Sequence, residues 1–139
     1  MSLIDKLLQM DKAKLMEVPT KEMEITRLTE LMGAPFKVKC KAIDGERYAE
    51  IQRAGVDITK KGSIKSLNIF EMHVLTVIDG VVEPSMKDAK LLQHFGCVTP
   101  KELVKKLFLA GEIADLNNII TELSGYEKDE DDEEEIKKQ

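Results

Sequence analysis

Apolar residues recur with two different spacings along this chain, and each spacing predicts a different kind of element. Near the start, one face of a helix is indicated by an apolar stripe formed by Leu3, Ile4, Leu7 and Leu8. Ser2 precedes this stripe in an N-cap position, and Asp5 follows three residues later, as in a capping box. We therefore expect a short helix over residues 2–10 that packs its stripe on a neighbouring element. Pro19 ends any helix before it, because it disfavours helical angles at Val18.

The next segment, up to residue 42, alternates with period two, which indicates half-buried strands. Over residues 21–28, Met23 and Ile25 point to one face. After a turn at residues 33–35, the apolar set of Phe36, Val38, Cys40 and Ala42 alternates with Lys37, Lys39 and Lys41. The two runs predict an antiparallel hairpin with acids opposite lysines, and each such pair contributes about 0.2–1 kcal/mol. A hairpin alone is marginally stable, so helices are expected to cover its apolar face.

From Asp44 onward the apolar spacing changes to 3.6, which predicts helices. We expect them from Asp44 to Gly55, over residues 66–78, from Ser85 to Gly96, from Thr99 to Phe108, and over residues 113–123. Residues 66–78 are apolar nearly all round, so that helix is expected at the centre of the fold. In the next segment, Ser85 is expected as N-cap and Phe95 as an inward-facing side chain. Residues 56–63 are expected to be a connector, and Gly111 an interruption between the last two helices.

Charge divides the chain into two parts. The 139 residues contain 26 acids and 21 bases, but residues 127–139 alone hold eight acids and three lysines. Residues 1–126 are therefore neutral overall and carry the apolar periodicity. We expect a mostly α (α+β) fold: a single small helical domain over residues 1–126, with one N-terminal antiparallel β-hairpin near residues 21–43. Residues 127–139 are expected to form a disordered acidic C-terminal tail.

Composition argues against several functional classes. No apolar run approaches the roughly 18 residues of a membrane span, and no secretory signal is expected at the start. A neutral body with only three arginines does not suit nucleic-acid binding. His94 and Cys97 could face one metal ion, but a zinc site needs further ligands, so no metal site is expected. Residues 60–63 (KKGS) lack the upstream glycine of a phosphate loop. We expect no enzyme activity and no cofactor.

Several landmarks nevertheless occur in a familiar order. Residues 19–25 (PTKEMEI) and 33–40 (GAPFKVKC) resemble the N-terminal part of the phage XkdN-like tail assembly chaperones. The resemblance continues through GVVEPS (80–85), LLQHFG (91–96), TPKEL (99–103), GEI (111–113) and LSG (123–125). It covers roughly residues 15–125, whereas the acidic tail and much of residues 56–65 lie outside it.

The resemblance implies a non-enzymatic assembly chaperone of a phage or prophage. Such a protein is expected to hold the tape measure protein soluble in the host cytoplasm until tail tube protein polymerises, and to be absent from the mature virion. The tail tube protein is a possible second partner, and a homo-oligomer stays open. Family relatives suggest a frameshifted longer product, for which residues 136–138 could be encoded by a slippery adenine run. The alternatives are a structural tail or connector protein, a nucleic-acid-binding regulator and an enzyme.

The partner surface is expected on exposed apolar residues of the last two helices or of the hairpin. Phe108 and Leu109 precede Gly111, where a helix end could leave both side chains uncovered. The seven methionines, which suit adaptable binding surfaces as well as irregular cores, leave the choice of surface open.

Overall fold

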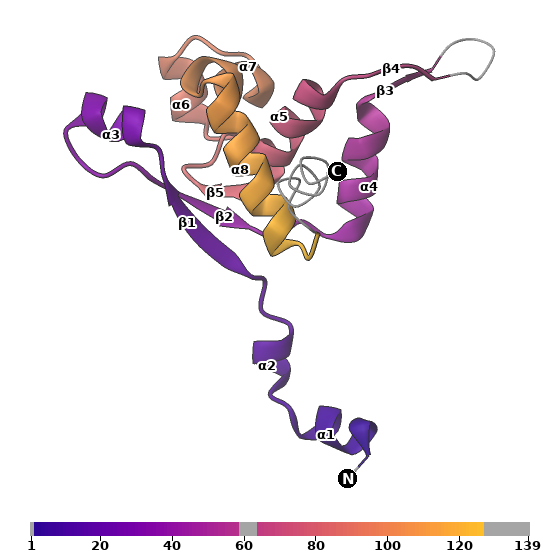
Figure 1. Ribbon diagram of the computed structural model, residues 1–139. Helices are drawn as coiled ribbons and strands as arrows, with labels where there is room; N and C mark the ends of the chain where they lie inside the picture. Colours follow the sequence, from indigo (N-terminus) through magenta and orange to yellow (C-terminus); the bar gives the residue numbers. More distant parts are fainter. Residues whose placement is uncertain (1, 59–63, 127–139) are drawn as a thin grey trace, which may run out of the picture.

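The computed structural model describes residues 2–58 and 64–126 (Figure 1). The helices in this part of the chain are α1 (Leu3–Gln9), α2 (Lys12–Leu15), α3 (Thr26–Met32), α4 (Gly45–Ala54), α5 (Ile69–Gly80), α6 (Ala89–His94), α7 (Pro100–Leu107) and α8 (Ala110–Leu123). The strands are β1 (Thr20–Glu24), β2 (Lys37–Lys41), β3 (Val56–Ile58), β4 (Ile64–Leu67) and β5 (Val81–Glu83). The fold is thus mostly helical with β structure near its start. The expected acidic tail lies outside the described residues.

The predicted hairpin is confirmed as β1 and β2. The two strands pair antiparallel, with Glu22 opposite Lys39 and Glu24 opposite Lys37. Along β2 the side chains alternate between exposed and buried, as the period-two pattern requires. A third strand, β5, pairs antiparallel with the other edge of β2 and gives the order β1-β2-β5. The sequence pattern did not predict β5.

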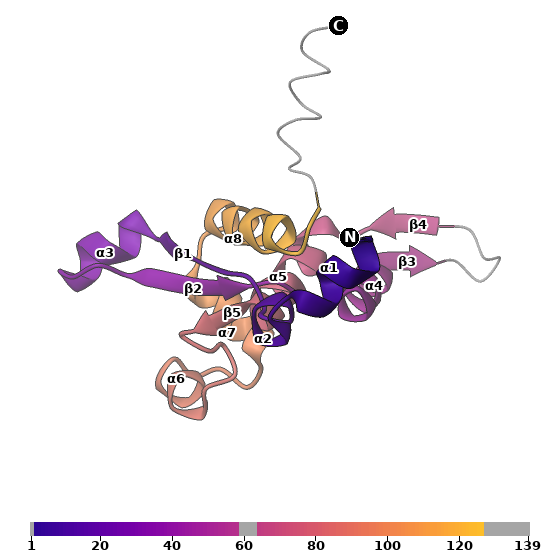
Figure 2. The ribbon, with the colours of Figure 1, turned by 90° about the horizontal axis from the view of Figure 1, so that it is seen from below.

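The hairpin connection holds a helix, where a simple turn was expected. Residues 26–28 belong to α3, so the predicted strand ends at Glu24. Thr29 ties this helix to both strands, because its hydroxyl donates to Glu24 Oε2 (2.8 Å) and accepts from the Phe36 N–H (2.9 Å). The helix ends at Gly33, whose N–H donates to the Thr29 carbonyl and whose left-handed φ of 76° turns the chain out of the helix. Figure 2 shows α3 at the far end of the β1–β2 pair.

The core lies between the inner face of the sheet and the helices of the C-terminal half. Helix α8 contacts β1 and β2, and α5 contacts α4, α7 and α8. The buried apolar residues are Ile25, Leu28, Val38, Cys40, Ile43, Ile51, Val74, Val77, Val81, Met86, Cys97, Leu103, Val104, Phe108, Ile113, Leu116 and Ile120. The first residue of this set is Ile25. No residue before β1 in the described chain is therefore part of the buried core. The expected central helix is confirmed as α5, although residues 66 and 67, which were expected in it, belong to β4.

Helices α5 and α8 pack closely because Gly80 has no side chain. A Cβ atom placed at Gly80 would overlap the buried Ile120 side chain of α8. Directly after Gly80 the chain enters β5, so this close approach lies next to the start of the third strand. Gly80 therefore both ends α5 and allows the close contact between α5 and α8.

Four local predictions are wrong. Asp88, rather than Ser85, caps α6 by accepting from the Leu91 N–H (3.0 Å), because Ser85 instead closes a turn with the Lys87 N–H (3.2 Å). Phe95, expected to face inward, is exposed at the end of α6. Gly111 was expected to interrupt the last two helices, but it lies inside the first turn of α8. The first N–H groups of a helix have no partner within it. The expected connector contains β3, which pairs with β4, although residues 59–63 lie outside the described chain.

Candidate partner-binding surface

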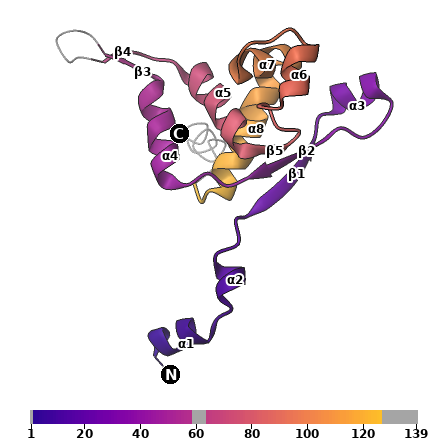
Figure 3. The same cartoon turned by 180° about the vertical axis from the view of Figure 1, so that it is seen from behind.

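The first part of the described chain, residues 2–18, forms an arm that leaves the body of the fold. It contains α1 and α2, and Figures 1 and 3 show it projecting beyond the sheet and helices. Local polar contacts define α1, as predicted: Ser2 Oγ accepts from the Asp5 N–H (3.2 Å), and Asp5 Oδ2 accepts from the Ser2 N–H (3.3 Å). Asp11 caps α2 by accepting from the Ala13 N–H (2.9 Å). We call residues 2–18 the N-terminal arm.

The N-terminal arm exposes its apolar side chains, and neither of its helices has a buried residue. Their exposed fractions run from 49% to 79%. The set comprises Leu3, Ile4, Leu7, Leu8, Met10, Leu15, Met16 and Val18. The predicted helix therefore exists, but the expectation that its stripe packs on a neighbouring element is wrong.

Such an arm is physically incomplete without a partner. Helices of seven and four residues are far shorter than the roughly 12–15 residues that an isolated helix needs for even marginal stability in water. A contiguous set of exposed leucine, isoleucine and methionine side chains is typical of a protein-binding surface. An apolar stripe at helical spacing suits the apolar face of another amphipathic helix.

The two predicted partner-binding residues lie together at the junction of α7 and α8, but in different environments. Phe108 is 3% exposed and belongs to the core, whereas Leu109 is 58% exposed. The expectation that both are uncovered is therefore wrong for Phe108. Sequence reasoning missed the arm as a candidate surface, although its apolar stripe was the available signal.

A polar cluster braces the same junction against α3. Arg27 donates from Nε to Glu112 Oε2 (3.1 Å) and from Nη2 to both Glu112 Oε1 (2.9 Å) and the Leu107 carbonyl (2.9 Å). Glu112 Oε1 also accepts from the Leu109 N–H (2.8 Å). The Arg27 hydrogen bonds lower the pKa of Glu112, aided by the Leu109 N–H, and burial opposes them. The carboxylate is thereby held in its charged form and fixes the start of α8.

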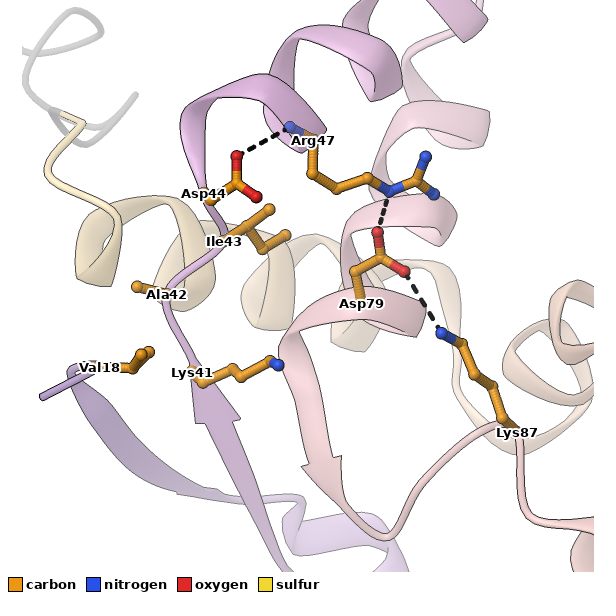
Figure 4. Close-up of a pocket in the computed structure, with 8 residues that line it drawn as sticks. All are labelled: Val18, Lys41, Ala42, Ile43, Asp44, Arg47, Asp79 and Lys87. Carbon is orange, nitrogen blue, oxygen red and sulfur yellow. Dashed lines mark hydrogen bonds and ion pairs between the residues drawn. The ribbon is translucent and has the colours of Figure 1, made fainter.

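A pocket of about 340 Å³ lies where the N-terminal arm joins the body (Figure 4). We call it the arm-root pocket, and its lining consists of Val18, Lys41, Ala42, Ile43, Asp44, Arg47, Asp79 and Lys87. Asp79 pairs with Arg47 through Nε and lies 3.9 Å from Lys87 Nζ. The hydrogen bonds that Arg47 donates to Asp79 and to Glu50 raise the pKa of Arg47, so its guanidinium stays charged. The pocket is thus lined by three cations and two carboxylates.

The thiols and histidines form no recognisable reaction centre in the part of the chain described. Cys40 and Cys97 are buried and form no disulfide with each other. Burial raises the pKa of Cys40 to about 11. A thiol in that state is a poor nucleophile at neutral pH. The His94 ring meets the edge of Phe95, with ring centroids 4.9 Å apart. Residues 2–58 and 64–126 contain no cluster of three His, Cys, Asp or Glu side chains suited to a metal ion, and none of their helices could cross a membrane.

Comparison with known proteins places these features in a family. The uncharacterised protein YqbN of Bacillus subtilis (strain 168) is 26% identical over 131 residues, which are 91% of this chain and 85% of YqbN. The crystal structure of the protein YqbN matches the fold with a TM-score of 0.57 at 20% identity, covering 85% of this chain and 98% of that one. The family described as phage XkdN-like tail assembly chaperone protein matches residues 4–137. This span includes nearly all of the N-terminal arm as well as the body, and the chain belongs to the phage XkdN-like tail assembly chaperone family.

Proposed function

We propose that this chain binds the tape measure protein of a phage tail and keeps it soluble until tail tube protein polymerises around it. The observation that carries this proposal is the N-terminal arm, whose eight large apolar side chains are all exposed. A tape measure protein is a long helical chain with apolar stripes, and such stripes need covering until the tube encloses them. The role requires binding only, without catalysis, and it takes place in the cytoplasm of the host.

The geometry of the arm suits a reversible partner. Each arm helix is short and has no buried residue, so its ordering on a partner opposes part of the free energy of binding. Binding by a few such turns gives modest affinity for each copy, and many copies can cover a long partner. Growing tube protein can then displace the copies one at a time.

Co-expression with the tape measure protein tests the proposal. We expect the tape measure protein to become soluble and to copurify with this chain, and to remain insoluble when Leu3, Ile4, Leu7 and Leu8 are replaced by serine. The matched control is Val98→Ser with Phe95→Ser, which removes exposed apolar side chains from the body instead of the arm. If the serine-substituted arm still solubilises the tape measure protein as well as the unchanged chain does, the arm is not the binding surface.

The second candidate function is a structural tail or connector component. The exposed arm would equally suit a permanent contact inside a particle. The two functions therefore differ in whether the protein is present in the finished particle. Mass spectrometry of purified particles distinguishes them, since a chaperone is absent from the finished particle and a structural component is present.

A further inference from the structure

A second pocket, of about 290 Å³, lies among helices α4, α5 and α8 in the body of the fold. We call it the interhelical pocket, and its lining consists of Tyr48, Ile51, Gln52, Ile69, Met72, His73, Thr76 and Asn117. Helix α5 contacts both α4 and α8, and Figure 3 shows it between them. Small-molecule sites occur between packed helices, and this volume is near the lower end of their range.

The floor of the interhelical pocket is buried and its mouth is exposed. Ile51, Thr76 and Asn117 are 1%, 2% and 8% exposed, whereas Gln52 of α4 and Ile69 at the start of α5 are exposed. None of the eight lining residues is an aspartate, glutamate, lysine or arginine. A charged group in the pocket would therefore lose its hydration without gaining an opposite charge from the lining, which is costly. The pocket thus favours an uncharged occupant.

Asn117 places an amide in an otherwise apolar stripe. The other buried residues of α8 are Ile113, Leu116 and Ile120. Among the described residues, none forms a hydrogen bond with the Asn117 side chain. The same part of the chain contains no unpaired side-chain polar atom that is sealed from solvent, so this amide faces open space, which the pocket supplies. Because a buried amide without a partner opposes folding, its position points to an occupant that pairs with it.

Thr76 restricts the chemistry of that occupant. Its hydroxyl donates to the Met72 carbonyl (2.9 Å), so its oxygen can only accept from the pocket. Asn117 offers both a donor and an acceptor, because its side chain is an amide. A carboxamide matches this set, since its nitrogen donates and its oxygen accepts. Ile51, Ile69 and Met72 supply apolar walls, and a methionine sulfur makes favourable contacts with aromatic rings.

We propose that the interhelical pocket binds a small uncharged molecule in which an aromatic ring carries a carboxamide. The carboxamide pairs with the Asn117 side chain and donates to Thr76 Oγ1, while the ring lies against Met72. A bound molecule contacts α4, α5 and α8 together and so stabilises the body by mass action. No residue of the N-terminal arm lines this pocket, so the proposal does not depend on tape measure binding.

Titration of the full chain with benzamide, followed by nuclear magnetic resonance, tests the proposal. We expect saturable shifts of the Asn117 side-chain amide signals and of the backbone amide signals of Ile51 and Thr76. The Kd should be on the order of millimolar or tighter, because benzamide is small. Benzoate has the same ring but a charged carboxylate, and toluene has the ring without an amide. Each should bind at least about tenfold more weakly than benzamide.

Two neighbouring asparagines of α8 provide the matched variants. Asn117→Leu keeps the approximate size of the side chain but removes the amide, so benzamide affinity should fall at least about tenfold. The free energy of unfolding should not fall, because an apolar group replaces an unpaired buried amide, and this readout separates lost recognition from lost folding. Asn118→Leu makes the same change at a residue outside the pocket lining, so benzamide affinity should stay unchanged.

Four results would overturn the proposal. The first is no saturable shift of the pocket signals with benzamide. The second is equal affinity for benzamide and for either toluene or benzoate, because the carboxamide would then not be recognised. The third is benzamide binding that survives Asn117→Leu. The fourth is loss of tape measure solubilisation in Asn117→Leu but not in Asn118→Leu, which would assign the pocket to a side chain of that partner instead of a small molecule.

Discussion

Helices α1 and α8 have similar apolar spacings, but the apolar face of α8 is buried and that of α1 is exposed. The α8 stripe supplies Ile113, Leu116 and Ile120 to the core, whereas the side chains of the α1 stripe are 49–79% exposed. The two helices differ in length, at fourteen and seven residues, and in their surroundings. Amphipathic spacing thus shows that an apolar face needs covering, and the tertiary structure decides whether the same molecule covers it. In this protein the body covers its own apolar faces and the N-terminal arm does not.

The largest expected effect is at Phe108, on the covered side of this comparison. Phe108→Ser should lower the free energy of unfolding by about 3–5 kcal/mol, because it removes a buried aromatic side chain and leaves a cavity. Denaturant unfolding followed by circular dichroism measures the change. A loss below about 1 kcal/mol would mean that the α7–α8 junction is not part of the core.

The neighbouring residue is the matched control. Leu109 is exposed and occupies the N-cap position of α8 in an extended conformation, without a side-chain cap. Leu109→Ser supplies a hydroxyl that can accept an orphan N–H, so the free energy of unfolding should rise by about 0.5–1 kcal/mol.

A smaller loss is expected at the contact of α5 with α8. Gly80→Ala places a methyl group against Ile120 and should cost about 1–3 kcal/mol of folding free energy through overpacking. Thermal unfolding of Gly80→Ala alone and together with Ile120→Val measures the cost. The second substitution should recover part of the loss if the two side chains compete for the same space.

Acid should weaken the brace between α3 and α8. The folded pKa of Glu112 is lower than the unfolded value of about 4.3, so the brace contributes its full stability above that pH. The contribution declines as pH falls below about 4.3 and is lost once pH passes the folded pKa. Unfolding measured across this range should show a shallower acid decline for Glu112→Gln than for the unchanged chain. Equal pH profiles would show that Glu112 titrates alike in both states.

The smallest effect on folding is expected in the N-terminal arm. Leu7→Ser with Leu8→Ser should change the free energy of unfolding by no more than about 0.5 kcal/mol, because both side chains are exposed. The unfolding midpoint in denaturant provides the measurement. A loss of about 2 kcal/mol or more would show that the arm packs on the body and would remove the contrast with α8.

Sequence patterns predicted those features of the fold that depend on local spacing. The alternation in β2 and the caps Ser2, Asp44 and Thr99 gave correct elements because each signal lies within a few residues. Helix α3 was missed because the alternation of Met23 and Ile25 was extended to residue 28, although Ile25 and Leu28 have a helical i, i+3 spacing. Strand β5 was missed because three residues show no period.

The candidate surfaces were less predictable, because they depend on which side chains the tertiary structure leaves uncovered. The pattern around Phe108 and Leu109 gave no means of telling the buried side chain from the exposed one. The arm-root pocket joins Lys41, Arg47 and Lys87 from β2, α4 and the segment before α6, which no local pattern relates.

The difference in size between α1 and the body limits how many copies of the proposed chaperone can bind along one partner. Seven residues of helix extend about 10 Å, so one α1 can cover roughly two turns of a helical partner. The body has just over a hundred residues, which corresponds to a radius of gyration of about 13 Å and a width on the order of 30 Å. Crowding between neighbouring bodies, rather than the footprint of the arm, therefore limits how densely copies line a tape measure. A saturated complex would leave stretches of the rod bare between the α1 contacts, unless copies alternate around its circumference.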